Sequence, residues 1–372
     1  MQASTRFTML RLHRWIGLVT ALLLFIQGMT GALLVFRDEI EGVLHPEIVL
    51  ETTGSRVPAQ FLADLAEEMR VGARVDRLTF GRSSNRASMA RLKDPAGGSF
   101  YVALDPYQGT VLRNGDITAW PMELLFAFHH ELFSGKVGTI IIGVEAILLI
   151  WLIGFGLLAW WPGTRRLRQG FRLARGTPDR LVRSLHRTVG GLLAVLLLVS
   201  AATGIMLVFK TSIGDMIGAV AKPAPKVAAR QGEPLLSLDR AVALARARVG
   251  NAALVELRLT GNHRQLLTIL FDDTRVLRGN AVDQVFVDRY SGAIVGRHHP
   301  ARLPTPNTIL DWAYTVHTGE ALGLLGRLFA LASGIVLLLF SVSGFWLWLS
   351  RTRQARAKCN AKSTQRAVGP IG

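Results

Sequence analysis

Four histidines stand at matched positions in two long stretches of the sequence. His13 and His186 lie 173 residues apart, each inside a Leu-His-Arg motif that opens an apolar run. His129 and His317 lie 188 residues apart, and each is followed by glycines six and nine residues later. A neutral imidazole offers a nitrogen lone pair to iron, while its other ring nitrogen donates a hydrogen bond that orients the ring.

Paired histidines of this kind predict haem sites. Two imidazoles at the same depth on facing helices supply both axial ligands of a six-coordinate b-type haem. We therefore expect His13 and His186 to hold one haem b, and His129 and His317 to hold a second. A single histidine at a membrane surface is commonly only a polar anchor, but four histidines in matched pairs favour iron ligation.

His130 is the alternative to His129 as a ligand of the haem iron. The glycines at +6 and +9 follow His129 as they follow His317, and this match favours His129. His130 is then expected to lie beside the ligand or to face the substrate.

Glycines accompany His13 and His186 at +4 and +18, on the helical face that carries each histidine. A porphyrin between helices needs such small residues, although glycines also serve plain helix packing. The four glycines are Gly17, Gly31, Gly190 and Gly204. Arg14 and Arg187 follow the two histidines directly and are candidates to pair with haem propionates, or are basic residues of a cytoplasmic membrane surface.

Glu145 lies inside a second apolar run, where a carboxylate is costly and marks a functional hypothesis. Three roles stay open for it from the sequence. These roles are proton relay, contact with a quinone or a haem propionate, and hydrogen bonding to a neighbouring polar group.

The elements that must position these residues are apolar spans. Half of the 372 residues are hydrophobic, which is unusual beside 43 Lys and Arg. The spans are approximately 12–36, 138–161, 188–209 and 327–349. Each can cross a hydrocarbon core that needs about 20 helical residues, so the predicted fold class is a membrane α-helical protein with four transmembrane helices.

The net charge of +17 is concentrated in three short segments. Residues 1–14 carry three Arg, residues 162–185 carry seven Arg and one Asp, and residues 351–372 carry six basic residues and no acid. Four crossings put all three segments on one side, so the positive-inside rule places both termini in the cytoplasm. This placement argues against nucleic acid as a partner and for contact with the lipid bilayer.

The segments between the spans are repeated as well. A strand, an Asp-initiated turn with a glycine and a second strand are expected at 102–111 and again at 285–294. An amphipathic helix precedes each hairpin, at 58–71 and at 237–249. Two small external α+β domains are therefore expected, and the whole chain is predicted to be a duplicated unit of helix, external domain and helix.

The predicted organisation has eight segments. They are the first transmembrane helix 1–36, the first external domain 37–128, the second helix 129–161, a basic cytoplasmic loop 162–185, the third helix 186–209, the second external domain 210–316, the fourth helix 317–350, and a cytoplasmic tail 351–372. We expect the tail to be disordered from residue 354.

Several enzyme classes are excluded by what the sequence lacks. It has no Gly-X-Gly-X-X-Gly after a strand, no P-loop and no His-Glu-X-X-His. The single cysteine, Cys359, does not form a c-type haem motif. Electrons must therefore come from a separate donor, which is either cytoplasmic or a quinol.

The sequence resembles the PepSY-associated transmembrane helix family, also described as iron-regulated membrane proteins. The resemblance covers nearly the whole chain. Its motifs are Leu12–Gly17, His129 with Gly135 and Gly138, Leu185–Arg187 with Gly190, and His317 with Gly319, Gly323 and Gly326. The hairpins at 105–109 and 288–292 look like PepSY domains.

Within that family the chain looks most like the inner-membrane ferric-siderophore reductases of Gram-negative bacteria. The resemblance implies two b haems, external domains in the periplasm and reduction of iron(III) in a siderophore on that side. Two other functions stay open. One is a haem subunit that passes electrons to a partner reductase, and the other is a non-redox regulator of peptidases, because PepSY domains resemble inhibitory propeptides.

Overall fold

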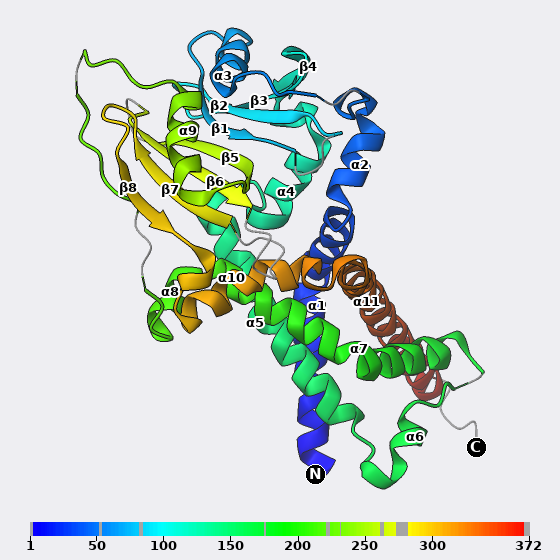
Figure 1. Ribbon diagram of the computed structural model, residues 1–372. Helices are drawn as coiled ribbons and strands as arrows, with labels where there is room; N and C mark the ends of the chain where they lie inside the picture. The colour runs from blue at the N-terminus through cyan, green and yellow to red at the C-terminus, as the bar shows by residue number, and fades with distance from the viewer. Residues whose placement is uncertain are drawn as a thin grey trace, which may run out of the picture. The chain divides into compact units, whose positions relative to one another are not determined.

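The computed structural model describes residues 3–51, 54–81, 85–174, 176–220, 224–230, 232–260, 264–272 and 282–367 (Figure 1). The chain divides into two units. The helical unit comprises Met1–Val35, Ala127–Lys210 and Val316–Gly372, and the sheet unit comprises Phe36–Phe126 and Thr211–Thr315.

The described residues of the helical unit contain four helices that are long and apolar enough to cross a membrane, as predicted. They are α1 (Ala3–Leu34), α5 (Gly135–Trp160), α7 (Pro178–Val208) and α11 (Gly323–Ala367). The prediction of a disordered tail is wrong as far as Ala367, because α11 continues through this basic, helix-favouring segment. Residues 368–372 lie outside the described part of the chain.

Small residues set the closest approach between α1 and α11. A Cβ added to Gly28 would lie 2.7 Å from the carbonyl oxygen of Gly334, and a Cβ added to Gly334 would lie 2.7 Å from the carbonyl oxygen of Gly28. Real Cβ atoms do not approach a backbone oxygen so closely. These two glycines therefore serve helix packing, which is their common role in membrane helices.

Two shorter helices precede α5 and α11. They are α4 (Pro121–Glu131) and α10 (Thr305–His317). His129 and His317 were predicted at the start of the second and fourth spans, whereas each lies near the end of one of these shorter helices. The chain breaks after α4 because Leu132 and Phe133 have positive φ angles of 49° and 54°.

Glycines allow the reversal between each short helix and the long helix that follows it. A Cβ on Gly138 would lie 1.8 Å from the carbonyl oxygen of Glu131, and a Cβ on Gly326 would lie 2.1 Å from that of Gly319. Gly319 also has a φ of +81°, which an L side chain rarely adopts. The repeated glycines after His129 and His317 are thus explained by these tight turns.

The loop between α5 and α7 contains η3 (Thr164–Arg166) and α6 (Leu167–Gly170). The indole Nε1 of Trp160 donates to the carbonyl oxygen of Gly170 over 3.2 Å. A Cβ on Gly191 of α7 would lie 3.0 Å from the same indole ring. Trp160 therefore lies between the basic loop and the middle of α7.

In the described part of the sheet unit, eight strands form one sheet in the order β4-β3-β2-β1-β5-β6-β7-β8, and all neighbours are antiparallel. The strands are β1 (Arg74–Thr79), β2 (Ser88–Lys93), β3 (Ser99–Asp105), β4 (Thr110–Asp116), β5 (Ala253–Thr260), β6 (Leu266–Asp272), β7 (Val282–Asp288) and β8 (Ile294–His298).

The two segments expected to form separate domains contribute four strands each to this sheet. They join at the β1–β5 pair, where Leu78 lies opposite Leu257 and both side chains are fully buried. The Arg77 guanidinium lies 3.3 Å from the Glu256 carboxylate beside this pair. The two segments therefore share one hydrophobic core.

Helices α3 (Ala59–Glu68) and α9 (Leu238–Val249) cover one face of the sheet (Figure 1). The Asp239 carboxylate accepts hydrogen bonds from the backbone N–H groups of Ala59 and Gln60, over 2.7 and 3.0 Å. A residue of α9 therefore caps the N-terminus of α3, which ties the second repeat to the first.

Both predicted hairpins are confirmed. The Asp105 carboxylate accepts from the backbone N–H of Tyr107, and the Asp288 carboxylate accepts from that of Tyr290. Gly109 and Gly292 follow with φ angles of +68° and +76°, the conformation that the turn requires. The remaining short elements of this unit are α2 (Arg37–Leu44), η1 (Pro46–Ile48), η2 (Ile117–Ala119), α8 (Lys210–Met216) and η4 (Pro300–Arg302), and η5 (Glu320–Leu322) belongs to the helical unit.

Candidate functional site

His13 of α1 and His186 of α7 face each other in the helical unit. Their ring centroids are 6.3 Å apart and their planes are inclined at 88°. Two imidazoles that grip one metal ion from opposite sides, through metal–nitrogen bonds of about 2 Å, have centroids about 6 Å apart. The pair thus has the spacing that axial ligation of one iron requires.

Hydrogen bonds fix the protonation of both rings. Nδ1 of His13 lies 2.9 Å from the carbonyl oxygen of Leu152, which only accepts, so Nδ1 carries the proton. Nδ1 of His186 lies 2.7 Å from the hydroxyl of Ser343, and that hydroxyl donates to the carbonyl oxygen of Phe340 over 3.3 Å. In the tautomer of His186 that is protonated at Nδ1, the Ser343 hydroxyl accepts, and both histidines then keep the lone pair at Nε2 that a metal ion needs.

His129 and His317 are the second predicted pair. Their rings are close enough for an electrostatic interaction between them. Nδ1 of His129 lies 2.7 Å from the hydroxyl of Thr30, and Nδ1 of His317 lies 3.0 Å from that of Thr203.

The two threonines determine the tautomer of this second pair. The Thr30 hydroxyl donates to the carbonyl oxygen of Ile26, and the Thr203 hydroxyl donates to that of Val199, each over 2.7 Å. Each hydroxyl therefore has only its lone pairs left for the histidine, which must donate from Nδ1–H. All four imidazoles consequently present Nε2 as the free donor atom for a metal.

Glycines make room for three of the four rings. A Cβ on Gly31 would lie 3.2 Å from Cε1 of His129, and a Cβ on Gly204 would lie 3.5 Å from Cε1 of His317. Gly31 and Gly204 thus seat the second pair, although the sequence analysis assigned them to the face of the first. Gly156 of α5 seats His13 in the same way, at 3.2 Å from its Cε1.

Gly17 and Gly190 lie farther from the imidazoles. A Cβ on Gly17 would lie 3.5 Å from the side chain of Leu152, and a Cβ on Gly190 would lie 3.7 Å from the ring of Phe340. Phe340 in turn lies against the ring of His186, with centroids 4.7 Å apart. These two glycines therefore contact the residues that position the first pair.

Arginines gather beside His13. The guanidinium of Arg14 lies within electrostatic range of His13 and of Arg351, and Arg351 is also within range of Arg183. By contrast, Arg187 donates to the carbonyl oxygen of Arg172 in the basic loop over 2.8 Å. Arg14 is thus the arginine that acts on His13, and Arg351 and Arg183, which were not predicted as site residues, extend the positive charge around Arg14.

His130 is exposed at the end of α4, while the neighbouring His129 makes the contacts described above. The amide of Gln27 donates to the carbonyl oxygen of His129 over 3.2 Å. The choice of His129 over His130 as the ligand stays a prediction.

Sequence reasoning missed the acceptors of the Nδ1–H groups. A signal existed for Thr30 and Thr203, because both stand in a Thr-Gly dipeptide that closes the repeated apolar run. No signal existed for Leu152 and Ser343, since their contacts depend on how helices pack.

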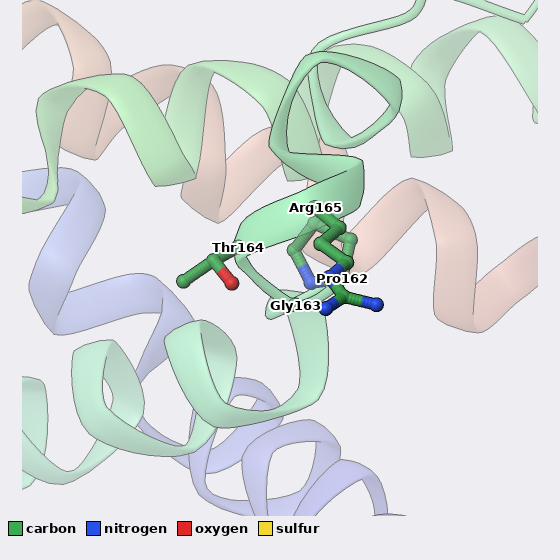
Figure 2. A pocket seen from close by; sticks show the side chains of 4 residues that line it. All are labelled: Pro162, Gly163, Thr164 and Arg165. Carbon is green, nitrogen blue, oxygen red and sulfur yellow. The ribbon is translucent and has the colours of Figure 1, made fainter.

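An open pocket of about 300 Å³ lies in the turn that follows α5, and Figure 2 shows the side chains that line it. Pro162, Gly163, Thr164 and Arg165 line it. None of these residues takes part in the histidine pairs, so this pocket is separate from the candidate site.

The residues present fit a metal held by two axial imidazoles, on the chemistry of the donor set. Each of the four rings has Nδ1 bound to an oxygen and Nε2 left for a ligand, which is the arrangement that orients histidines toward metals.

Comparison with known proteins places this arrangement in a family. No curated protein matches the chain. The four histidines lie within the match to the PepSY-associated TM region, which extends over residues 10–351, and the chain belongs to that family.

Proposed function

We propose that this protein carries electrons across the bacterial inner membrane by means of two b haems and reduces the iron(III) of a siderophore on the periplasmic side. His13 and His186 would hold one haem, and His129 and His317 the other. A haem with two imidazole ligands changes between the iron(III) and iron(II) states and so transfers one electron at a time.

The observation that carries this proposal is the common state of the four imidazoles. Each donates from Nδ1 to a backbone or hydroxyl oxygen, and each keeps the Nε2 lone pair. The first pair also has the ring spacing of axial ligands. Arg14 and its arginine neighbours supply positive charge that suits the carboxylates of a porphyrin.

The substrate follows from the chemistry of iron. Hard oxygen donors of the hydroxamate type match the higher charge of iron(III) and bind iron(II) far more weakly. Reduction therefore releases the metal without any change to the chelator. The electron donor would be a cytoplasmic reductant or a membrane quinol, because the chain has no nucleotide-binding motif of its own.

Orientation is part of the proposal. The basic segments would lie in the cytoplasm with both termini, and the sheet unit would lie in the periplasm, where its two PepSY-like halves would face the chelate.

The first experiment is an absorption spectrum of the full chain purified in detergent, oxidised and then reduced with dithionite. A reducible b-type spectrum is expected. A colourless protein would refute the proposal and favour a non-redox regulator of peptidases.

Histidine variants then test the ligands. His13→Ala and His186→Ala should each remove about half of the reducible signal, because each leaves one of two haems without an axial ligand. His130→Ala is the matched control and should keep the whole signal. Full retention in both ligand variants would refute the assignment.

A final measurement tests the substrate. The reduced protein should convert a ferric hydroxamate to iron(II), detected with a chromogenic iron(II) chelator. A reducible protein that leaves the ferric chelate unchanged would instead be a haem subunit serving a partner reductase.

A further inference from the structure

Glu145 is the one ionisable side chain in the central stretches of the four spanning helices. Residues 15–34 of α1, 188–208 of α7 and 328–350 of α11 contain no Asp, Glu, Lys, Arg, His, Cys or Tyr, and residues 137–160 of α5 contain only Glu145. The nearest charged or titratable groups are at the ends of these stretches. They are the four paired histidines, Arg14, Lys136, Arg187 and Arg327.

The Glu145 carboxyl is enclosed by protein. It is 3% exposed, although most side chains of the spanning helices face outward. Within the described residues, neither Oε1 nor Oε2 has a hydrogen-bond partner. An ionised carboxylate without donors is costly in such surroundings, so its charge must be stabilised by something else or removed by a proton.

Glu145 also lies midway between the two histidine pairs. Leu152, whose carbonyl oxygen accepts from His13, is seven residues along α5 in one direction. Gly138, packed on the backbone of Glu131 just beyond His129, is seven residues along in the other. Seven residues are two turns, so all three lie on one helical face, with about 10 Å from Glu145 to each neighbour.

This position makes the charge of Glu145 sensitive to the charge at the histidine pairs. A bis-histidine haem has one more positive charge when oxidised than when reduced. In a medium of low dielectric constant, a positive charge within the bundle favours the carboxylate, and its loss favours the neutral acid.

We propose that Glu145 takes up one proton from the aqueous phase when one electron enters the bundle, and releases one proton when that electron leaves. The electron comes from the donor and goes to the ferric chelate, so one electron and one proton enter and leave together. The O–H bond formed on the carboxylate is the only bond that changes. Charge then passes through the membrane interior without a net charge building up there.

This inference rests on the proposed function, and infrared spectroscopy separates the two. The reduced-minus-oxidised difference spectrum of the full chain should contain the carbonyl band of a protonated carboxylic acid that appears on reduction and shifts in D2O. Glu145→Gln should lack that band while keeping both b-type absorption signals. Glu68→Gln, which alters an exposed residue of α3, is the control and should keep it.

The pH dependence of the midpoint potentials provides a second readout. The wild-type potentials should fall as the pH rises, because proton uptake accompanies reduction, and Glu145→Gln should flatten this dependence. Glu145→Asp, which keeps a carboxyl group, should restore both the band and the slope.

Three results would overturn the inference. They are a wild-type difference spectrum without the carboxyl band, a band unchanged in Glu145→Gln, and potentials equally pH-dependent in both proteins. Each of these leaves the haem proposal standing, whereas a chain that binds no haem refutes both.

Discussion

Thr30 and His129 are joined by a hydrogen bond of 2.7 Å, in which the hydroxyl accepts from Nδ1–H because it already donates to the carbonyl oxygen of Ile26. Thr203 and His317 repeat this relationship at 3.0 Å. The acceptor orients the imidazole ring and increases its electron donation through Nε2. Two hydroxyl groups, one on α1 and one on α7, therefore orient the imidazole rings of the second histidine pair.

The first prediction concerns a substitution of Thr30 by valine, which removes the hydroxyl group and keeps the shape of the side chain. Thr30→Val should weaken haem retention at the second pair by about 10- to 100-fold and raise its midpoint potential, because a less basic ligand stabilises iron(III) less well. Haem content and spectroelectrochemistry measure the two effects. Thr20→Val is the matched control, since the buried Thr20 hydroxyl donates to the carbonyl oxygen of Ile16 on the same helix. Equal potentials in Thr30→Val and wild type would contradict the prediction.

The second prediction concerns the space that Gly156 leaves for His13. In Gly156→Ala the new methyl group would lie 3.2 Å from Cε1 of His13, so the ring must move and the first haem signal should shift or fall. Gly154 has nothing within 4 Å of an added Cβ and is exposed, so Gly154→Ala should keep the wild-type spectrum. Low-temperature absorption and electron paramagnetic resonance spectra of the ferric protein resolve the two centres. Identical spectra for the two variants would argue against the contact.

The third prediction distinguishes the arginines. Arg351 lies within electrostatic range of Arg14 and Arg183, whereas Arg187 donates to the carbonyl oxygen of Arg172. Arg351→Gln should therefore lower the midpoint potential of the first centre, because removing a positive charge favours the oxidised form. Arg187→Gln should produce a smaller change. A redox titration at low ionic strength makes the comparison, and a larger shift in Arg187→Gln would reverse the assignment.

The fourth prediction concerns pH and the sheet unit. Burial raises the pKa of Glu41, and His45, the backbone of Met122 and Arg37 oppose that shift in part. A raised pKa means that the stability from the neutral carboxyl is present below the ordinary value of 4.5 and is lost as the pH rises through the folded-state pKa.

Glu41→Gln cannot ionise, so its stability relative to wild type should increase as the pH rises above 4.5. Thermal unfolding of both proteins between about pH 4 and pH 8 measures this difference. The exposed Glu68→Gln should show no such trend. A stability difference independent of pH would show that Glu41 acts through packing alone.

The long helices and the hairpin turns could be predicted because their causes are local. A bilayer requires about 20 consecutive apolar residues, which a sequence displays directly. The turn at Asp105 likewise needs a carboxylate that accepts nearby N–H groups and a glycine with positive φ at Gly109. In each case the residues responsible lie in one short, continuous stretch of the sequence.

The parts that escaped prediction depend on distant residues. The strand pair Leu78–Leu257 joins positions 179 residues apart, and nothing in either strand identifies the other. The contact between His13 and the carbonyl oxygen of Leu152 has the same character, because any residue type supplies a carbonyl. The helices α4 and α10 were not predicted as separate elements. Their ends, which carry His129 and His317, were assigned to the second and fourth spans, and the rest of each was assigned to an external domain.

The central place of β1 in the sheet has a consequence for synthesis on the ribosome. β1 is complete at Thr79, but its partner β5 begins only at Ala253, so one edge of β1 stays unpaired for roughly ten seconds or more at elongation rates of about 5–20 residues per second. An unpaired edge invites pairing with other nascent chains, and a charged side chain on it discourages this. Arg77 stands on that edge, and when the second half of the chain arrives the same guanidinium meets Glu256. Arg77 thus first discourages pairing of this edge with other chains, and later forms an ion pair with the partner strand.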